Sequence, residues 1–125
     1  MLKDAKSLTT LPAADMERAK RWYQDKLGLE PVEEMTGGNR YETAAGTGFT
    51  IYPTPNPDRG GHTQLAFGVA DLDSEVTGLK GRGVVFEEYD MPGLKTVNGI
   101  AEFDGQRGAF FKDSEGNILG IVQMD

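Results

Sequence analysis

Few side chains of this 125-residue chain have the chemistry expected of a catalyst. The chain contains one histidine, His62, and no cysteine. Histidine is a common general base near neutral pH, but no partner that would orient the ring of His62 can be identified from the sequence. His62 lies two positions before Gln64, on the same face of an extended chain, which also suits a plain polar residue near the start of a strand. One histidine cannot supply the two-histidine, one-carboxylate set of non-haem iron enzymes within a single subunit.

Carboxylates are more plentiful, with 20 acidic against 13 basic residues and a net charge of −7. An acidic surface repels phosphate backbones, so we expect no nucleic-acid partner, whereas a cationic small molecule is compatible with it.

Lys95 and Asn98, in a predicted loop over 89–99, could meet an anion or a carbonyl, or the loop could be a plain connection. Several acidic residues could attract a cation or form a solvated face: Glu33, Glu34, Glu42, Glu87, Glu88 and Asp90.

Composition also restricts the compartment and the size of the protein. Without cysteine there are no disulfides and no thiolate metal sites, which fits a cytoplasmic location. No apolar run approaches the roughly 18–20 residues of a membrane span, and no signal-peptide pattern opens the chain. We therefore expect no membrane partner, and one domain or two small halves that share a core.

The first half of the chain predicts the order strand, helix, strand, strand, strand. Asp15 is a good N-cap for a helix over 16–27, and Gly28 is a suitable C-terminal stop. Trp22 falls beside the apolar stripe of this helix, a place suited to an interface between subunits or modules. The predicted strands cover 7–13, 29–35, 40–45 and 48–53.

The second half repeats this order after a proline- and glycine-rich linker over 54–61. A helix capped by Asp71 or Asp73 follows the first strand, and a polar turn over 113–117 joins the last two strands. Ala14-Asp15-Met16-Glu17 aligns with Ala70-Asp71-Leu72-Asp73 at an offset of 56 residues. We predict a single domain of two modules, 7–53 and 62–125, with strands at 62–70, 84–90, 99–113 (a hairpin bent at Asp104-Gly105) and 117–123.

Three stretches carry a resemblance to a known group of proteins: LPAADMERAKRWYQDKLGLEPVEE, TQLAFGVADLDSEVTGLKGRGVVFEE and AFFKDSEGNILGIVQ. In this order and spacing they resemble the vicinal oxygen chelate superfamily, which includes glyoxalase I, extradiol dioxygenases and bleomycin-resistance proteins. The resemblance implies an α+β fold, in which two βαβββ modules form a curved, cup-shaped mixed sheet with helices on the outside. It also implies a homodimer.

The resemblance also says where a metal would sit. In the enzymes of the superfamily, a divalent ion is held from the first and last strands of both modules. The equivalent positions here are Leu8, Thr50, Gln64 and Gly120, so the set carries no charge. A divalent ion prefers three or more imidazole or carboxylate ligands, and we therefore expect no metal or other cofactor.

We expect a small-molecule ligand in the cup, and no residue is assigned a catalytic role. Glycine weakens a strand interior, so Gly120 either vacates volume for the ligand or eases the curvature of the sheet. The expected function is ligand binding without the metal; the alternative is a glyoxalase-like lyase or a dioxygenase-type enzyme with a divergent or absent metal site. The predicted ligand-binding residues are Leu8, Thr10, Thr50, Tyr52, Gln64 and Gly120. The residues expected to pack beneath the helices are Leu11, Phe49, Ile51, Leu65, Phe67, Val69, Leu119 and Ile121.

Overall fold

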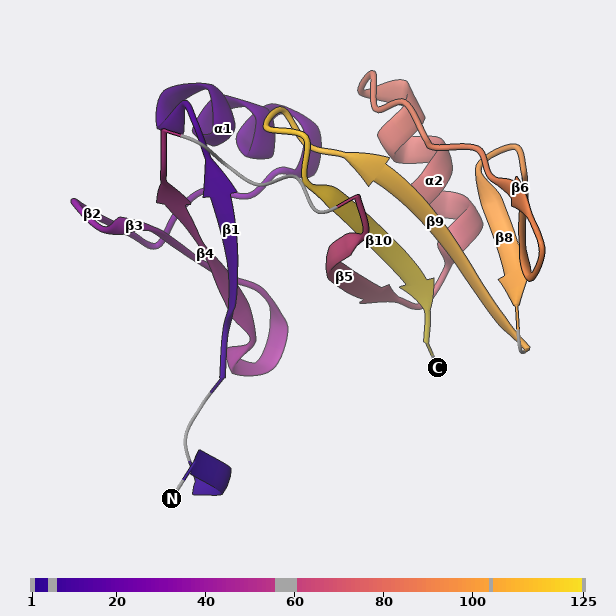
Figure 1. Ribbon diagram of the computed structural model, residues 1–125, viewed down its shortest axis with the longest axis horizontal. Coiled ribbons are helices and arrows are strands. Elements are labelled where there is room, and N and C mark those ends of the chain that lie inside the picture. Colours follow the sequence, from indigo (N-terminus) through magenta and orange to yellow (C-terminus); the bar gives the residue numbers. More distant parts are fainter. Residues whose placement is uncertain (1, 5–6, 56–60, 104, 125) are drawn as a thin grey trace.

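The computed structural model describes residues 2–4, 7–55, 61–103 and 105–124, arranged as two modules that each combine one helix with one mixed sheet (Figure 1). One sheet has four strands and the other has six, and they are separate rather than closed into a barrel. Most of the predicted linker, residues 56–60, lies outside the described residues, as does Asp104 of the predicted hairpin bend.

The first module follows the predicted order of elements. Its sheet has the order β1-β4-β3-β2, with β1 parallel to β4 and the other neighbours antiparallel. The helix begins after Asp15, whose side chain accepts a hydrogen bond from the Arg18 amide (3.0 Å). Its last turn widens into a π turn before Gly28, where φ is 70°. The elements are β1 (Thr9–Ala13), α1 (Met16–Trp22), the π turn (Tyr23–Leu27), β2 (Glu33–Met35), β3 (Gly38–Glu42) and β4 (Gly48–Pro53).

The second module repeats this plan. Its sheet has the order β5-β10-β9-β8-β7-β6, and the parallel pair β5–β10 is the counterpart of β1–β4. Asp71 rather than Asp73 caps the helix, since it accepts from the Ser74 amide (3.1 Å). The predicted α+β arrangement of two modules is therefore confirmed, although they form two separate sheets rather than one, and the second sheet has six strands. The bounds 7–53 and 62–125 stay a prediction. The elements are β5 (Thr63–Val69), α2 (Leu72–Gly81), β6 (Asp90–Met91), β7 (Leu94–Val97), β8 (Ile100–Phe103), β9 (Gln106–Lys112) and β10 (Ile118–Gln123).

The predictions for residues 84–99 are wrong in two respects. Where a strand is predicted over 84–90, the structure has a single bridge between Phe86 and Phe111, followed by the short strand β6. Where a loop is predicted over 89–99, β6 and β7 form a hairpin. Proline followed by a glycine at φ 81° makes a tight turn at Pro92-Gly93, and the Thr96 amide donates to the Tyr89 carbonyl (2.9 Å).

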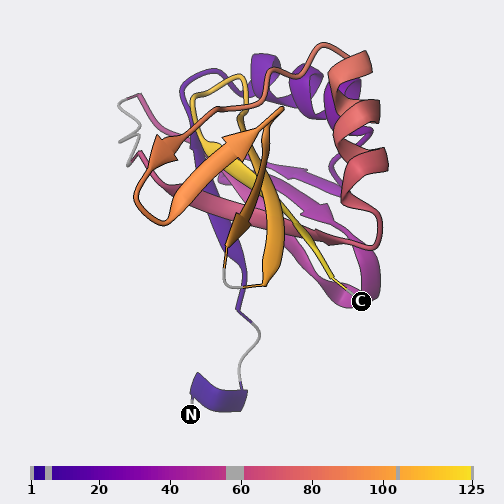
Figure 2. The same cartoon turned by 90° about the vertical axis from the view of Figure 1, so that its right-hand side faces the viewer.

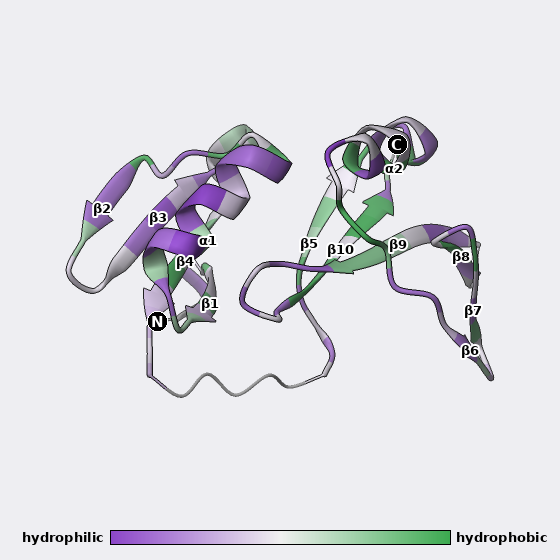
Figure 3. Ribbon diagram, turned by 90° about the horizontal axis from the view of Figure 1, so that it is seen from above, coloured by the Kyte–Doolittle hydropathy of each residue, from purple (hydrophilic) through white to green (hydrophobic). Residues whose placement is uncertain are grey.

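Both helices lie on the same side of the sheets, where they cover one shared core (Figures 1 and 2). Figure 3 shows hydrophobic residues concentrated in β5, β9 and β10, and hydrophilic ones on α1 and β2. Of the residues expected beneath the helices, Leu65, Phe67 and Val69 are half-buried and the others are buried. Within the described residues, neither helix is long and apolar enough to cross a membrane.

Aromatic contacts join the two modules across this core. Trp22 of α1 stacks against Phe111 of β9, with ring centroids 6.2 Å apart, so it occupies the interface between modules. Phe49 of β4 meets Phe67 of β5 edge to face at 6.1 Å. Such pairs stabilise a core beyond the area that they bury.

A buried carboxylate provides a second link between the modules. Glu115 belongs to the turn between β9 and β10, yet only 1% of its surface is exposed. It accepts hydrogen bonds from the backbone amides of Ala14 (3.0 Å) and Asp15 (3.1 Å), and from Nε of Arg18 (2.7 Å). Burial alone would raise the pKa of Glu115, but hydrogen bonds from Arg18, the Asp15 amide and Ser114 lower it to about 2. A turn of the second module therefore binds the first turn of α1.

The rest of this turn continues the link. Asp113 accepts a hydrogen bond from the Tyr23 hydroxyl (2.7 Å) and another from the Asn117 side chain (2.9 Å). Asn117 also donates to the carbonyl of Pro12 in β1 (3.0 Å). Burial and the adjacent Asp113 carboxylate raise the pKa of Tyr23, so its hydroxyl stays protonated and donates. The residues predicted to form only a polar turn thus hold the modules together.

Glu115→Gln should lower the free energy of unfolding by roughly 3 kcal/mol, because the Arg18 cation and two amides lose a buried carboxylate. Urea denaturation monitored by circular dichroism would measure the loss. Glu17→Gln is the matched control, since Glu17 carries the same charge and is exposed in the first turn of α1, the turn that Glu115 binds. Equal stabilities of the two variants would contradict this role of Glu115.

Acid should weaken the same link. The pKa of Glu115 falls from its usual value of 4.5 to about 2 on folding, so the unfolded chain takes up the proton more readily. The stabilisation is complete above pH 4.5 and is lost as the pH falls towards about 2. Urea denaturation at a series of pH values should show the stability difference between wild type and Glu115→Gln shrinking over this interval. A difference independent of pH would contradict the assignment.

Candidate functional site

The predicted ligand-binding residues of the first module lie on the sheet face opposite α1. Thr10 of β1 pairs with Thr50 of β4, and Pro12 pairs with Tyr52, whereas the intervening Leu11 and Ile51 point into the core. Tyr52 is 38% exposed and Leu8, just before β1, is 58% exposed. The structure therefore brings Thr10 and Thr50 together on an open surface that also carries Tyr52.

The predicted residues of the second module lie on the other sheet. Gly120 of β10 pairs with Ala66 of β5 and with Phe110 of β9. Gln64 falls where the register shifts, because Ile118 pairs with Thr63 and the next residue pairs with Leu65. Gln64 is therefore the bulged, half-buried residue of β5, and it has no partner in the β10 register.

An aromatic side chain that sequence reasoning missed borders Gly120. A Cβ atom on Gly120 would lie 3.5 Å from Phe110, 3.4 Å from Thr63 and 3.6 Å from Ala66, which are ordinary contacts. Tyr89 stands edge-on to Phe110, with ring centroids 5.8 Å apart. Counting back along the hairpin from the turn over 113–117 would have placed Phe110 opposite Gly120.

Met124 is a second residue that the sequence did not indicate. A Cβ atom on Gly68 would overlap the sulfur of Met124, so the methionine covers this end of β5. The Met124 amide donates to the Val69 carbonyl (2.7 Å), which continues the β10–β5 pairing beyond the predicted strand. Methionine is flexible and can move to admit a ligand.

Most of the acidic residues weighed as a cation-attracting rim bind basic neighbours. Arg40 pairs with Thr50 in the β3–β4 register, and its guanidinium contacts both Glu33 (3.2 Å) and Glu42. The hydrogen bonds that Arg40 donates to Glu42 and Glu33 raise the pKa of Arg40. Two further ion pairs link Lys20 to Glu34 (3.0 Å) and Lys112 to Glu87 (3.3 Å). These pairs favour the interpretation of the acidic residues as a solvated, charge-balanced surface rather than as a site that attracts a cation.

Three further candidates are His62, Lys95 and Asn98. His62 is exposed just before β5. The Asn98 carbonyl accepts a hydrogen bond from Lys80 (3.0 Å), and Asn98 has a positive φ of 54° in the turn after β7. Lys95 and Asn98 line a surface depression beside α2 whose lining includes none of the six predicted residues.

The residues at the metal positions of the resembled superfamily do not fit a divalent ion. Leu8 and Gly120 have no side-chain donor, and Thr50 and Gln64 are neutral. Among the residues that the structure describes, no group of three or more histidine, aspartate or glutamate side chains is arranged as metal ligands.

The chain belongs to the Glyoxalase/Bleomycin resistance protein/Dioxygenase superfamily, whose model matches residues 7–121. This result confirms the resemblance drawn from the three sequence stretches. No curated protein matches the chain in sequence.

Solved structures of the same fold are similar over nearly the whole chain. The antibiotic binding protein TnmS3 from Streptomyces sp. CB03234 is 21% identical with a TM-score of 0.66, covering 98% of each chain. A glyoxalase family protein from Enterococcus faecalis is 20% identical with a TM-score of 0.72, covering 98% of this chain and 99% of that one. The fosfomycin resistance protein FosX from Listeria monocytogenes is 17% identical with a TM-score of 0.68, covering 98% and 94%.

Alanine substitution should separate the two roles considered for Gly120. Gly120→Ala should change the free energy of unfolding by less than about 1 kcal/mol, because its Cβ meets only ordinary contacts. Gly38→Ala is the comparison, since φ is 145° there and a Cβ would lie 2.6 Å from the Ile51 carbonyl oxygen. We expect it to cost on the order of 2 kcal/mol. Comparable losses in urea denaturation would favour a backbone role for Gly120.

Proposed function

We propose that the protein binds a small organic molecule on the sheet faces opposite its helices, without the metal ion of the related enzymes. The observation that carries this proposal is the chemistry of the family metal positions. They hold Leu8, which is exposed, Thr50 and Gln64, which are half-buried, and Gly120, which is buried between its neighbouring strands. A surface of this kind binds by shape, apolar contact and a few neutral hydrogen bonds.

The side chains on these faces suggest how a ligand is held. Thr10, Thr50 and Gln64 offer hydroxyl and amide groups for orientation. Tyr52 and the Phe110–Tyr89 pair offer aromatic surface for stacking against a flat ligand. The net charge of −7 favours a cationic ligand. Binding of an antibiotic is a property that TnmS3 is named for, and an antibiotic is the ligand class that we propose to test first.

A homodimer would enclose this site. In one chain the two faces belong to separate sheets, and they expose apolar side chains such as Leu8, Tyr52 and Met124. A second copy laid over these faces would bury that apolar surface and turn two open sheet faces into a walled cup. Light scattering coupled to size exclusion would test the dimer directly.

Gly120→Leu should abolish binding of the antibiotic that stabilises the wild type most in a thermal-shift screen. The leucine side chain would extend beyond the ordinary contacts of a Cβ and fill the space beside Phe110. Isothermal titration calorimetry of wild type, Gly120→Ala and Gly120→Leu would measure the effect. Gly120→Ala is the matched control and should retain most of the affinity.

Two results would overturn the proposal. Unchanged binding by a folded Gly120→Leu variant would move the ligand to another site. Retention of one zinc, nickel or iron ion per chain after incubation and gel filtration, together with turnover of a glyoxalase or dioxygenase substrate, would favour the enzyme alternative.

A further inference from the structure

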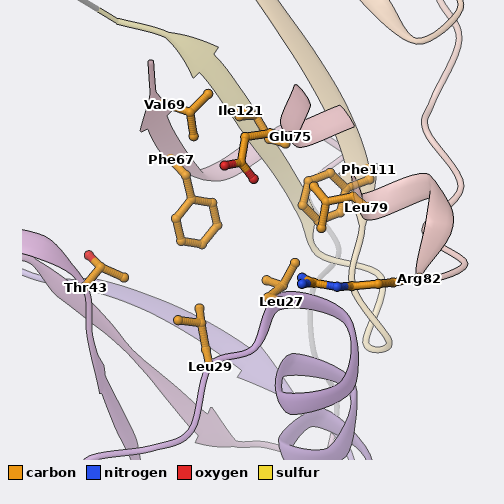
Figure 4. Close-up of a pocket in the computed structure, with 10 residues that line it drawn as sticks. All are labelled: Leu27, Leu29, Thr43, Phe67, Val69, Glu75, Leu79, Arg82, Phe111 and Ile121. Atoms are coloured by element: carbon orange, nitrogen blue, oxygen red, sulfur yellow. The ribbon is translucent and has the colours of Figure 1, made fainter. Parts of the chain in front are cut away.

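A separate cavity of about 170 Å³ lies on the helix side of the sheets, between the two modules (Figure 4). Leu27 and Leu29 of the first module form one wall. Phe67, Val69 and Phe111 of the second module form much of the other wall. None of the six predicted ligand-binding residues lines it, so this cavity is distinct from the proposed site on the opposite sheet faces.

The cavity follows from the way in which the chain leaves α1. The helix ends in the π turn over Tyr23–Leu27 and the left-handed Gly28, which turn the chain away from the axis of α1. Leu27 and Leu29 are left half-buried there. Across the gap, Phe67 and Val69 are half-buried as well, although both point towards the helix side. The seam between the modules, closed elsewhere by the Trp22–Phe111 contact, therefore stays open here.

The size and lining of the cavity suit one aromatic ring. An apolar cavity of about 150 Å³ lined by leucine, isoleucine and phenylalanine is large enough to bind benzene. This cavity is slightly larger, and seven of its ten lining residues are leucine, isoleucine, valine or phenylalanine. It is open to solvent on one side, so a ring can enter without unfolding and can carry a polar group at the mouth.

One side of the cavity is a face of α2 with charge at both ends. Glu75 and Leu79 of α2, and Arg82 at its C-terminal cap, follow the i, i+4, i+7 spacing of a helix face, and all three line the cavity. The carboxylate and the guanidinium therefore arise from positions about 10 Å apart along the helix. A charged group on the ligand can approach one of them while its ring covers Leu79.

The two charged residues are not equally available. NH1 of Arg82 donates to the Lys26 carbonyl (3.4 Å), and Nζ of Lys26 donates to the Arg82 carbonyl (2.7 Å), which ties Arg82 to the first module. Glu75 points into the cavity (Figure 4), and over the described ranges no ion pair involves its carboxylate. The net charge of −7 adds a long-range preference for cations.

We propose that this cavity is a second binding site, for a single-ring apolar compound that carries an ammonium group. The ring lies between Leu29, Phe67 and Leu79, and the ammonium group lies beside Glu75. The site needs neither the proposed ligand of the sheet faces nor a second copy of the chain.

The test is a titration of ¹⁵N-labelled protein with three probes of similar size, followed by NMR. Benzylamine, protonated at neutral pH, should shift the amide signals of Leu29, Val69 and Leu79 saturably. Uncharged benzyl alcohol should bind the same residues more weakly, and benzoate more weakly still. Glu75→Gln should weaken benzylamine binding about twofold to fivefold and leave benzyl alcohol unaffected.

Two further variants complete the test. Glu17→Gln removes an exposed carboxylate outside the cavity lining and should leave benzylamine affinity unchanged. Val69→Phe should fill part of the cavity and weaken all three probes. The proposal is overturned if benzylamine causes no saturable shifts at the cavity residues, or if Glu75→Gln weakens benzylamine and benzyl alcohol equally.

Discussion

The buried carboxylate of Glu115 is the contact on which the arrangement of the two modules depends. It accepts hydrogen bonds from two amides at the start of α1 and from Arg18, so its charge is matched by donors of the other module. A buried carboxylate is costly unless it is paired and hydrogen-bonded in this way. The charge is therefore stabilised in one relative placement of the modules, and any placement that left it unpaired would be less stable.

This placement shapes both surfaces of the molecule. Because β1 and the closing turn are linked through Pro12 and Asn117, the helix faces of the two sheets meet in one aromatic core. In the part of the chain that the structure describes, no helix covers the opposite faces, and the proposed ligand site lies there. On the helix side, the modules meet at Trp22 and Phe111 but not at Leu29 and Val69, which leaves the second cavity. Both proposed sites, which lie on opposite sides of the sheets, therefore follow from the way in which the two modules pack together.

The sequence predicts the module plan well because local signals carry it. Asp15 and Asp71 cap their helices with nearly the same backbone geometry, and each falls at the same point of the repeat. Alternation likewise places Thr10 and Thr50 on one face, as β-strand geometry requires. Residues 84–99 are the exception, because the proline and glycine that predict a long loop form a two-residue turn between β6 and β7.

The sequence by itself determined the fold class, the repeat and the neutral chemistry of Leu8, Thr50, Gln64 and Gly120, since these follow from residue type and local spacing. Only the tertiary structure decided that Glu115 is buried against α1 and that Leu29 faces Val69 across a gap. Both of these contacts join residues of separate elements across the module boundary. No local pattern encodes such contacts, because they arise when two independently patterned surfaces pack together.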